Sequence, residues 1–189
     1  MTTNDFTDCK STIEKISEDT EYQVTMSHNK TECFNFDKVK EQYLKSLGLK
    51  GKECKSIDGL LLHNNIHYFI EFKNGTLTDK KHRSRKITDI CLKIKASLII
   101  YCDIENKHIS DIRKTDEFIL VYNEEKNPLY NNESPSNIAI KEYFTKKAGN
   151  EFIRFGLERY DGLYFKSVHT YTEKEFEAFM DELQSKMRQ

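Results

Sequence analysis

Apolar residues recur at intervals of three and four positions in several stretches of the chain, which predicts amphipathic helices. The predicted helices cover residues 5–17, 36–47, 84–104, 136–148 and a last segment that begins after Thr172. Asn35 can cap the start of the second helix, and Gly48 can end it. Thr172 and Glu175 have the spacing of a capping box, so the last helix has the best-defined start.

Shorter apolar runs predict strands. They cover residues 22–26, 54–62, 66–73, 118–122, 151–158 and 163–168. His63-Asn64-Asn65 joins the second strand to the third, and Asp161-Gly162 joins the last two, as hairpin turns do. The order helix, strand, strand, helix, strand predicts an α/β (α+β) fold. We expect one domain over residues 1–189, with a central mixed sheet flanked by helices and a C-terminal hairpin and helix at 151–187.

Composition narrows the class of protein. A chain of 189 residues is long enough for one domain with a full core, and abundant Phe and Tyr compensate for an apolar content of 37%. The net charge of −1 provides no field over the whole protein that would attract nucleic acid. Any binding to nucleic acid therefore requires a local basic patch.

The same sequence argues against several other classes. Five cysteines without a C-x-x-C pair indicate reduced thiols in a cytoplasmic protein and disfavour a zinc site. The N-terminus lacks the pattern of a signal peptide, and the strongest apolar run, Leu98–Cys102, is too short to span a bilayer. The phosphate-binding loop, the G-x-G-x-x-G fingerprint and the G-x-S-x-G elbow are all absent from the sequence.

Candidate chemistry is concentrated around the first predicted hairpin. Glu71 and Lys73 are two apart on a predicted strand, so their side chains share a face, opposite Tyr68, Ile70 and other apolar residues. The hairpin brings Asp58 close to both. Two carboxylates and an ammonium can hold a divalent cation, Mg²⁺ or Mn²⁺, and orient a water beside a phosphodiester.

Asp58, twelve intervening residues and then Glu71-Phe72-Lys73 resemble the motif of the PD-(D/E)xK nuclease superfamily. The order of predicted elements over about 35–123 resembles the core of that superfamily as well. The resemblance implies a restriction-endonuclease-like core and a magnesium-dependent phosphodiesterase that acts on DNA or RNA. It implies Asp58 and Glu71 as metal ligands and Lys73 as the group that positions or activates the attacking water.

The sequence departs from that pattern at two places. Ile57 stands where the superfamily motif has proline. The preceding helix provides no obvious third carboxylate, since Glu41 projects away from its apolar face and Glu53 lies close to the start of the next strand. The missing third carboxylate bears on the expected metal affinity and not on the expected fold.

A basic run follows the motif directly. Its permanently cationic residues are Lys80, Lys81, Arg83, Arg85 and Lys86. The functional interpretation is contact with the phosphate backbone of a nucleic acid beside the metal site. The alternative interpretation is a solvated loop, which is the commoner role of an isolated charge run.

Three alternatives to an enzyme or to a functional site stay open. The fold can persist without catalysis in an immunity protein or in an interaction subunit of a defence or mobile-element system, which the near-zero net charge favours. Glu71 and Lys73 can occupy a solvent-exposed strand, or pair with each other as a dry structural contact. His67 shares their face, where a surface position is the commoner outcome for a strand histidine.

Overall fold

The computed structural model describes residues 7–49, 53–77, 83–128 and 152–187, and shows a single α+β domain built on a mixed six-stranded sheet. The strand order in the sheet is β1-β4-β5-β6-β7-β8. These strands are β1 (Lys10–Thr12), β4 (Glu32–Asn35), β5 (Gly59–His63), β6 (Ile66–Lys73), β7 (Glu117–Tyr122) and β8 (Ser167–Thr172). A separate two-stranded ribbon pairs β2 (Glu18–Asp19) with β3 (Val24–Thr25).

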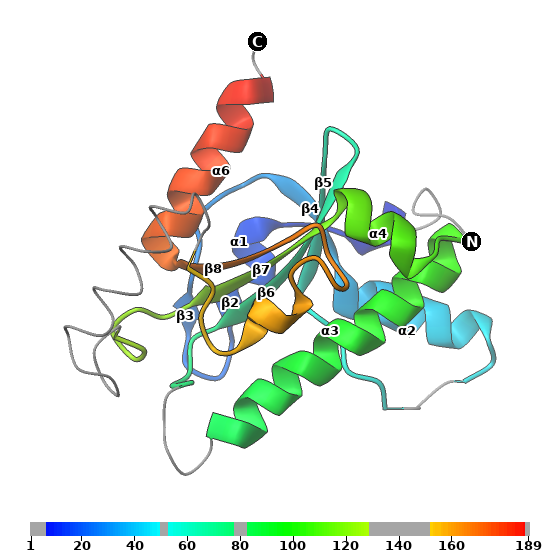
Figure 1. The fold of residues 1–189 in the computed structure, drawn as a ribbon, viewed down its shortest axis with the longest axis horizontal. Coiled ribbons are helices and arrows are strands. Elements are labelled where there is room, and N and C mark those ends of the chain that lie inside the picture. Colours follow the sequence, from blue (N-terminus) through cyan, green and yellow to red (C-terminus); the bar gives the residue numbers. More distant parts are fainter. Residues whose placement is uncertain (1–6, 50–52, 78–82, 129–151, 188–189) are drawn as a thin grey trace.

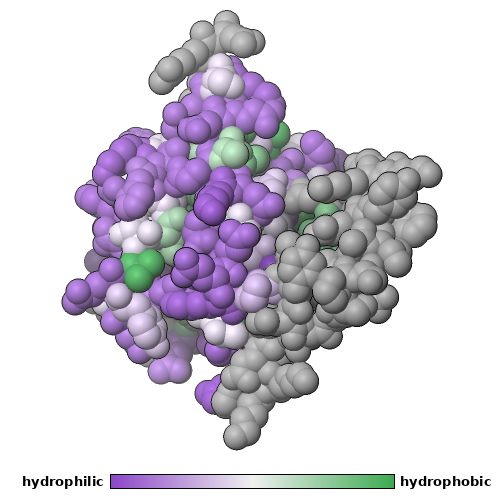
Figure 2. Space-filling view, turned by 90° about the vertical axis from the view of Figure 1, so that its left-hand side faces the viewer, coloured by the Kyte–Doolittle hydropathy of each residue, from purple (hydrophilic) through white to green (hydrophobic). Residues whose placement is uncertain are grey.

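Helices cover both faces of the sheet (Figure 1). They are α1 (Ile13–Ile16), α2 (Phe36–Ser46), α3 (Arg83–Glu105), α4 (Ile109–Thr115) and α6 (Glu173–Met187), with a 3₁₀ turn, η2, at Leu157–Tyr160. The core on one face packs α2, α3, α4 and η2 against the sheet. The core on the other face packs α1 and α6 against it. The described residues on the face drawn in Figure 2 are mostly hydrophilic, with hydrophobic residues in small separate areas.

The central strands carry the predicted motif. β5 and β6 form an antiparallel hairpin whose turn residues Asn64 and Asn65 have φ of 48° and 62°, which confirms the predicted turn. β6 then pairs with β7 in parallel, and α3 makes the crossover between them. β6 is buried on both faces. Phe69 packs toward α3, and Ile70 packs toward α6.

Several predicted elements are confirmed. α2, β6, α3 and β7 lie within one or two residues of their predicted bounds. The Asn35 side chain accepts a hydrogen bond from the Lys38 backbone N–H (3.0 Å), as an N-cap does. The capping box of α6 is also present: Glu175 N–H donates to Thr172 Oγ1 (3.2 Å), and Thr172 N–H donates to Glu175 Oε2 (2.8 Å).

The predicted N-terminal helix 5–17 is wrong over most of its length. Only Ile13–Ile16 are α-helical, because residues 7–9 form a 3₁₀ turn and Lys10–Thr12 form β1 and pair with β4. The Thr12 side chain caps the short helix by accepting from Lys15 N–H (3.3 Å). The predicted strand 22–26 is reduced to β3, which pairs with β2. Non-local strand pairing therefore overrides the helical spacing of the apolar residues.

The predicted hairpin around Asp161-Gly162 is also wrong. Residues 151–158 form no strand within the described part, and η2 takes their place. The Asp161 carboxylate accepts from Val168 N–H (2.9 Å), and the Tyr160 carbonyl accepts from three following N–H groups, so a compact turn replaces a ladder. The strand comes later than 163–168, as β8, and runs parallel to β7. The predicted helix 136–148 lies outside the described residues.

Gly59 stands at a close approach of α1 to β5. A Cβ at position 59 would lie 2.1 Å from Ile16 Cδ1. We expect Gly59→Ala to lower the free energy of unfolding by about 1 kcal/mol, because the Cδ1 end of the Ile16 side chain must move from its packed position. Gly75→Ala is the matched control, since a Cβ there meets nothing within 4 Å. Urea unfolding of both variants checks this, and equal midpoints would contradict it.

Candidate metal and phosphate site

The start of β5 lies beside the end of β6, and this places Asp58 next to Glu71. Gly59 is paired with Ile70, and Asp58 N–H donates to the Ile70 carbonyl (3.1 Å). Asp58 Oδ2 accepts from the Phe72 backbone N–H (2.7 Å), which fixes the carboxylate against β6. The motif residues that the sequence singled out, Asp58, Glu71 and Lys73, thus come together in space.

Asp58 itself lies just before a strand, not inside one. The predicted strand 54–62 is too long at its start, since β5 begins at Gly59. Asp58 still makes backbone hydrogen bonds, to the Ile70 carbonyl and from Phe36 N–H, whereas side chains hold the two residues before it. Ile57 N–H donates to Ser97 Oγ of α3 (2.9 Å), and Ser56 Oγ donates to Asp37 Oδ1 of α2 (2.5 Å).

Glu71 is completely buried, so the interpretation of a solvent-exposed strand face is wrong. Its Oε1 accepts from the ammonium groups of both Lys73 and Lys93, each at 2.7 Å. Its Oε2 is buried and has no hydrogen-bond partner among the described residues. Burial and the nearby Asp58 charge raise the pKa of Glu71 to about 7, although Lys73 and Lys93 offset part of the effect.

Lys93 completes the cluster and was missed in the sequence. Its Nζ, from α3, lies 2.7 Å from Glu71 Oε1 and 3.3 Å from Asp58 Oδ1. Burial lowers the pKa of Lys93, but the Glu71 and Asp58 carboxylates outweigh it and raise the pKa well above its ordinary value. The available signal was a polar row on α3, because Asp89, Lys93 and Ser97 are spaced four residues apart and share a side of the helix.

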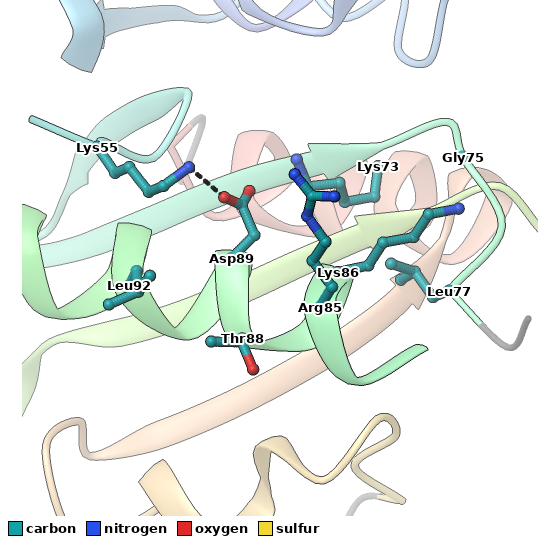
Figure 3. Close-up of a pocket in the computed structure, with 9 residues that line it drawn as sticks. All are labelled: Lys55, Lys73, Gly75, Leu77, Arg85, Lys86, Thr88, Asp89 and Leu92. Carbon is teal, nitrogen blue, oxygen red and sulfur yellow. Dashed lines mark hydrogen bonds and ion pairs between the residues drawn. The ribbon is translucent and has the colours of Figure 1, made fainter. Parts of the chain in front are cut away.

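Glu71 and Lys73 pair with each other, as in a purely structural contact, but the contact is not shielded from solvent. Lys73 Nζ pairs with Glu71 while its side chain stays 26% exposed. Lys73 also lines a pocket of about 700 Å³ between the end of β6 and the start of α3 (Figure 3). Asp58 and Glu71 do not line this pocket. Lys73 is therefore the link between the carboxylate cluster and the pocket.

The pocket is strongly basic. Four of the nine residues that line it are cationic, namely Lys55, Lys73, Arg85 and Lys86. Lys55 forms an ion pair with Asp89 across it, drawn in Figure 3, and Lys86 Nζ donates to the Thr76 carbonyl (2.7 Å). Partial burial opposes ionisation of Asp89, but Lys55, Lys73 and Lys93 together lower the pKa of its carboxyl.

The predicted basic run is only partly described. Arg85 and Lys86 line the pocket, as a phosphate-contacting role requires. Arg83 begins α3, and nothing further is described of its side chain. Lys80 and Lys81 lie outside the described residues.

The other polar residues considered in the sequence do not join the cluster. His67 shares the face of Phe69, but it is buried and pairs with Asp116 Oδ1 (3.2 Å), so the prediction of a surface histidine is wrong. Glu41 and Glu53 are exposed. On α2, burial opposes ionisation of the Asp37 carboxyl. The charges of Lys40 and Lys93 contribute to lowering the pKa of Asp37 despite its burial.

The carboxylate oxygens of Asp58 and Glu71 are of the kind that magnesium prefers, but these two side chains are few ligands for a metal ion. Among residues 7–49, 53–77, 83–128 and 152–187, no three His, Cys, Asp or Glu side chains are grouped for a metal ion. Mg²⁺ is commonly bound through one or two carboxylates, with waters and substrate phosphates completing the shell. Asp58 and the unpartnered Glu71 Oε2 fit that requirement.

Comparison with family models, curated proteins and solved structures found no match to this chain. Within the described part of the chain, the helices are too short or too polar to cross a membrane. The functional argument therefore depends on the geometry of the cluster and the pocket.

Proposed function

We propose that this protein is a divalent-metal-dependent phosphodiesterase, nuclease-like, acting on DNA or RNA. One observation carries the proposal: carboxylates from two adjoining strand ends converge on a single point, which the Lys93 ammonium marks at 3.3 Å from Asp58 and 2.7 Å from Glu71. The order α2, β5, β6, α3, β7 supports a restriction-endonuclease-like core, because it agrees with the order that the PD-(D/E)xK resemblance implies.

The chain supplies a distinct group for each task. Asp58 and Glu71 would hold Mg²⁺ or Mn²⁺, and the bound metal would act as a Lewis acid and make its bound water more acidic. Lys73 faces both the carboxylates and the pocket, so its ammonium orients the water and the scissile phosphate. Lys55, Arg85 and Lys86 contact the phosphate backbone in the pocket, where charge-assisted hydrogen bonds to phosphate are strong.

Burial at Glu71 supports a ligand at the cluster. A buried carboxylate oxygen without a partner costs about 1–3 kcal/mol. The Glu71 side chain has such an oxygen, Oε2, although two ammonium groups are close enough to share its other oxygen. A cation bound by the Glu71 carboxylate would reduce this cost, whereas a purely structural ion pair through Oε1 leaves it in place.

A second candidate function is a catalytically silent binding protein with the same fold, such as an immunity protein or a defence-system interaction subunit. It is favoured by the charge balance of the cluster, in which Lys73 and Lys93 neutralise Asp58 and Glu71. A net charge of −1 also provides little general attraction to nucleic acid. In this alternative the basic pocket receives an acidic group of a protein partner.

Cleavage assays separate the two candidates. We expect the purified protein to cut DNA or RNA with Mg²⁺ or Mn²⁺ and not with EDTA. Lys73→Met is expected to slow cleavage by about 100-fold, the order of effect of a positioned acid, base or charge. Lys186→Met, on α6 at the opposite face of the sheet, is the matched control with unchanged cleavage. Cleavage by Lys73→Met at the unmodified rate would refute the assigned role, and no cleavage of any substrate would favour the silent protein.

A further inference from the structure

Lys93 occupies the position that a cation shared by Asp58 and Glu71 has to take. Its Nζ contacts both Asp58 Oδ1 and Glu71 Oε1. We propose that Lys93 is a built-in counter-ion that competes with the divalent cation, and that metal binding requires its ammonium to move away. This inference rests on the proposed function, because it concerns the access of the cation to the same two carboxylates.

The local structure holds Lys93 over the carboxylates. Ser97 lies one turn further along α3 and accepts from Ile57 N–H, so the segment that carries Asp58 is fixed to the same side of the helix as Lys93. The Lys93 side chain is 19% exposed, and that of Asp58 is 21% exposed. Neutralisation by an ammonium makes the buried Glu71 carboxylate and the partly buried Asp58 carboxylate tolerable without metal, since unneutralised charges of one sign repel strongly away from water.

Asp89 provides an alternative position for the displaced ammonium. It lies one turn before Lys93 on α3, the spacing at which an acid and a following lysine pair across a helical turn. Its side chain is 33% exposed on the pocket wall, and Lys93 already contributes to lowering its pKa. The four-carbon stem of lysine is flexible enough to reach either acceptor. We therefore assign Lys93 two positions, one on Asp58 and Glu71 and one on Asp89.

Two variants of α3 test this assignment in opposite directions. Lys93→Met removes the competing ammonium. We therefore expect this variant to bind Mn²⁺ about tenfold more tightly than the unmodified protein does. Asp89→Asn removes the negative charge of the alternative acceptor, so we expect weaker Mn²⁺ binding. If Asp89 acts through Lys93, its effect becomes much smaller in the double variant with Lys93→Met, which a double-mutant cycle measures.

The measurement is calorimetric titration of the full-length protein with Mn²⁺ alone, without substrate. Lys95→Met is the matched control, since Lys95 is an exposed lysine two residues further along the same helix. Lys93→Gln is a second variant in case Lys93→Met fails to fold, because glutamine removes the charge and keeps a donor for the carboxylates. A second readout is the increase in the thermal unfolding midpoint when Mn²⁺ is added. We expect this increase to be larger for the two position-93 variants than for the unmodified protein.

The outcomes separate the inference from the function on which it rests. Tighter binding by the position-93 variants, with Lys95→Met unchanged, supports the competing lysine. Equal or weaker binding by these variants, when the unmodified protein binds Mn²⁺, overturns the inference and leaves the proposed function standing. Binding by neither protein at millimolar Mn²⁺ overturns the metal site and the proposed function with it. Binding only after Lys93 is replaced supports the lysine and favours the silent protein.

Discussion

Replacing Asp58 by asparagine is expected to lower divalent-dependent cleavage by about three powers of ten, because a ligated metal contributes several kcal/mol to the transition state. Asparagine keeps an oxygen that can accept from Phe72 N–H, the hydrogen bond that Asp58 Oδ2 now makes at 2.7 Å. The variant therefore separates the charge of residue 58 from its structural contact. Initial rates of cleavage at saturating Mg²⁺ measure the effect.

The control for Asp58 is Asp181→Asn, which removes an exposed carboxylate from α6 on the other face of the sheet. We expect this control to cleave at the rate of the unmodified protein. Thermal unfolding of both variants establishes that the fold is intact. A folded Asp58→Asn protein that cleaves within a factor of two of the unmodified rate would remove Asp58 from the site.

The second large effect concerns the pH dependence of stability. The pKa of Glu71 is raised by burial to about 7, from an ordinary value of 4.5. Folding therefore favours the protonated form, so the stabilisation is fully present below pH 4.5 and is lost as the pH rises through 7. The loss amounts to about 3 kcal/mol of unfolding free energy, since one pKa unit corresponds to about 1.4 kcal/mol.

Glu71→Gln isolates this effect, because glutamine does not titrate and all other groups are shared. Urea unfolding of both proteins between pH 4.5 and 8, in EDTA, gives the difference in unfolding free energy at each pH. We expect the unmodified protein to lose stability relative to Glu71→Gln by about 3 kcal/mol across that range. Parallel pH profiles would show that Glu71 is ionised throughout, held so by Lys73 and Lys93.

The central part of the fold could be predicted because local signals and tertiary packing agree there. Asn35 caps α2, the Asn64-Asn65 turn closes the β5–β6 hairpin, and the two-residue period of β6 puts Glu71 and Lys73 on one face. The antiparallel register then brings Asp58 beside them. The convergence of these three residues follows from strand geometry alone.

Lys93 could not be predicted in the same way. A lysine at the border of an amphipathic helix is usually solvated, and only the packing of α3 on the sheet sets the direction in which it points. The predictions for the N-terminal and C-terminal regions were wrong for a related reason. β1 pairs with β4 and β8 with β7, partners that are distant in sequence, and no local periodicity carries that information.

A crystal structure of the protein in Mn²⁺, with anomalous diffraction at the manganese edge, tests the central claim most directly. The account predicts one anomalous peak between the Asp58 and Glu71 carboxylates, at the place that the Lys93 ammonium now occupies, with that ammonium moved off both. A map at saturating Mn²⁺ without a peak there, and with Lys93 still bridging Asp58 and Glu71, would contradict it.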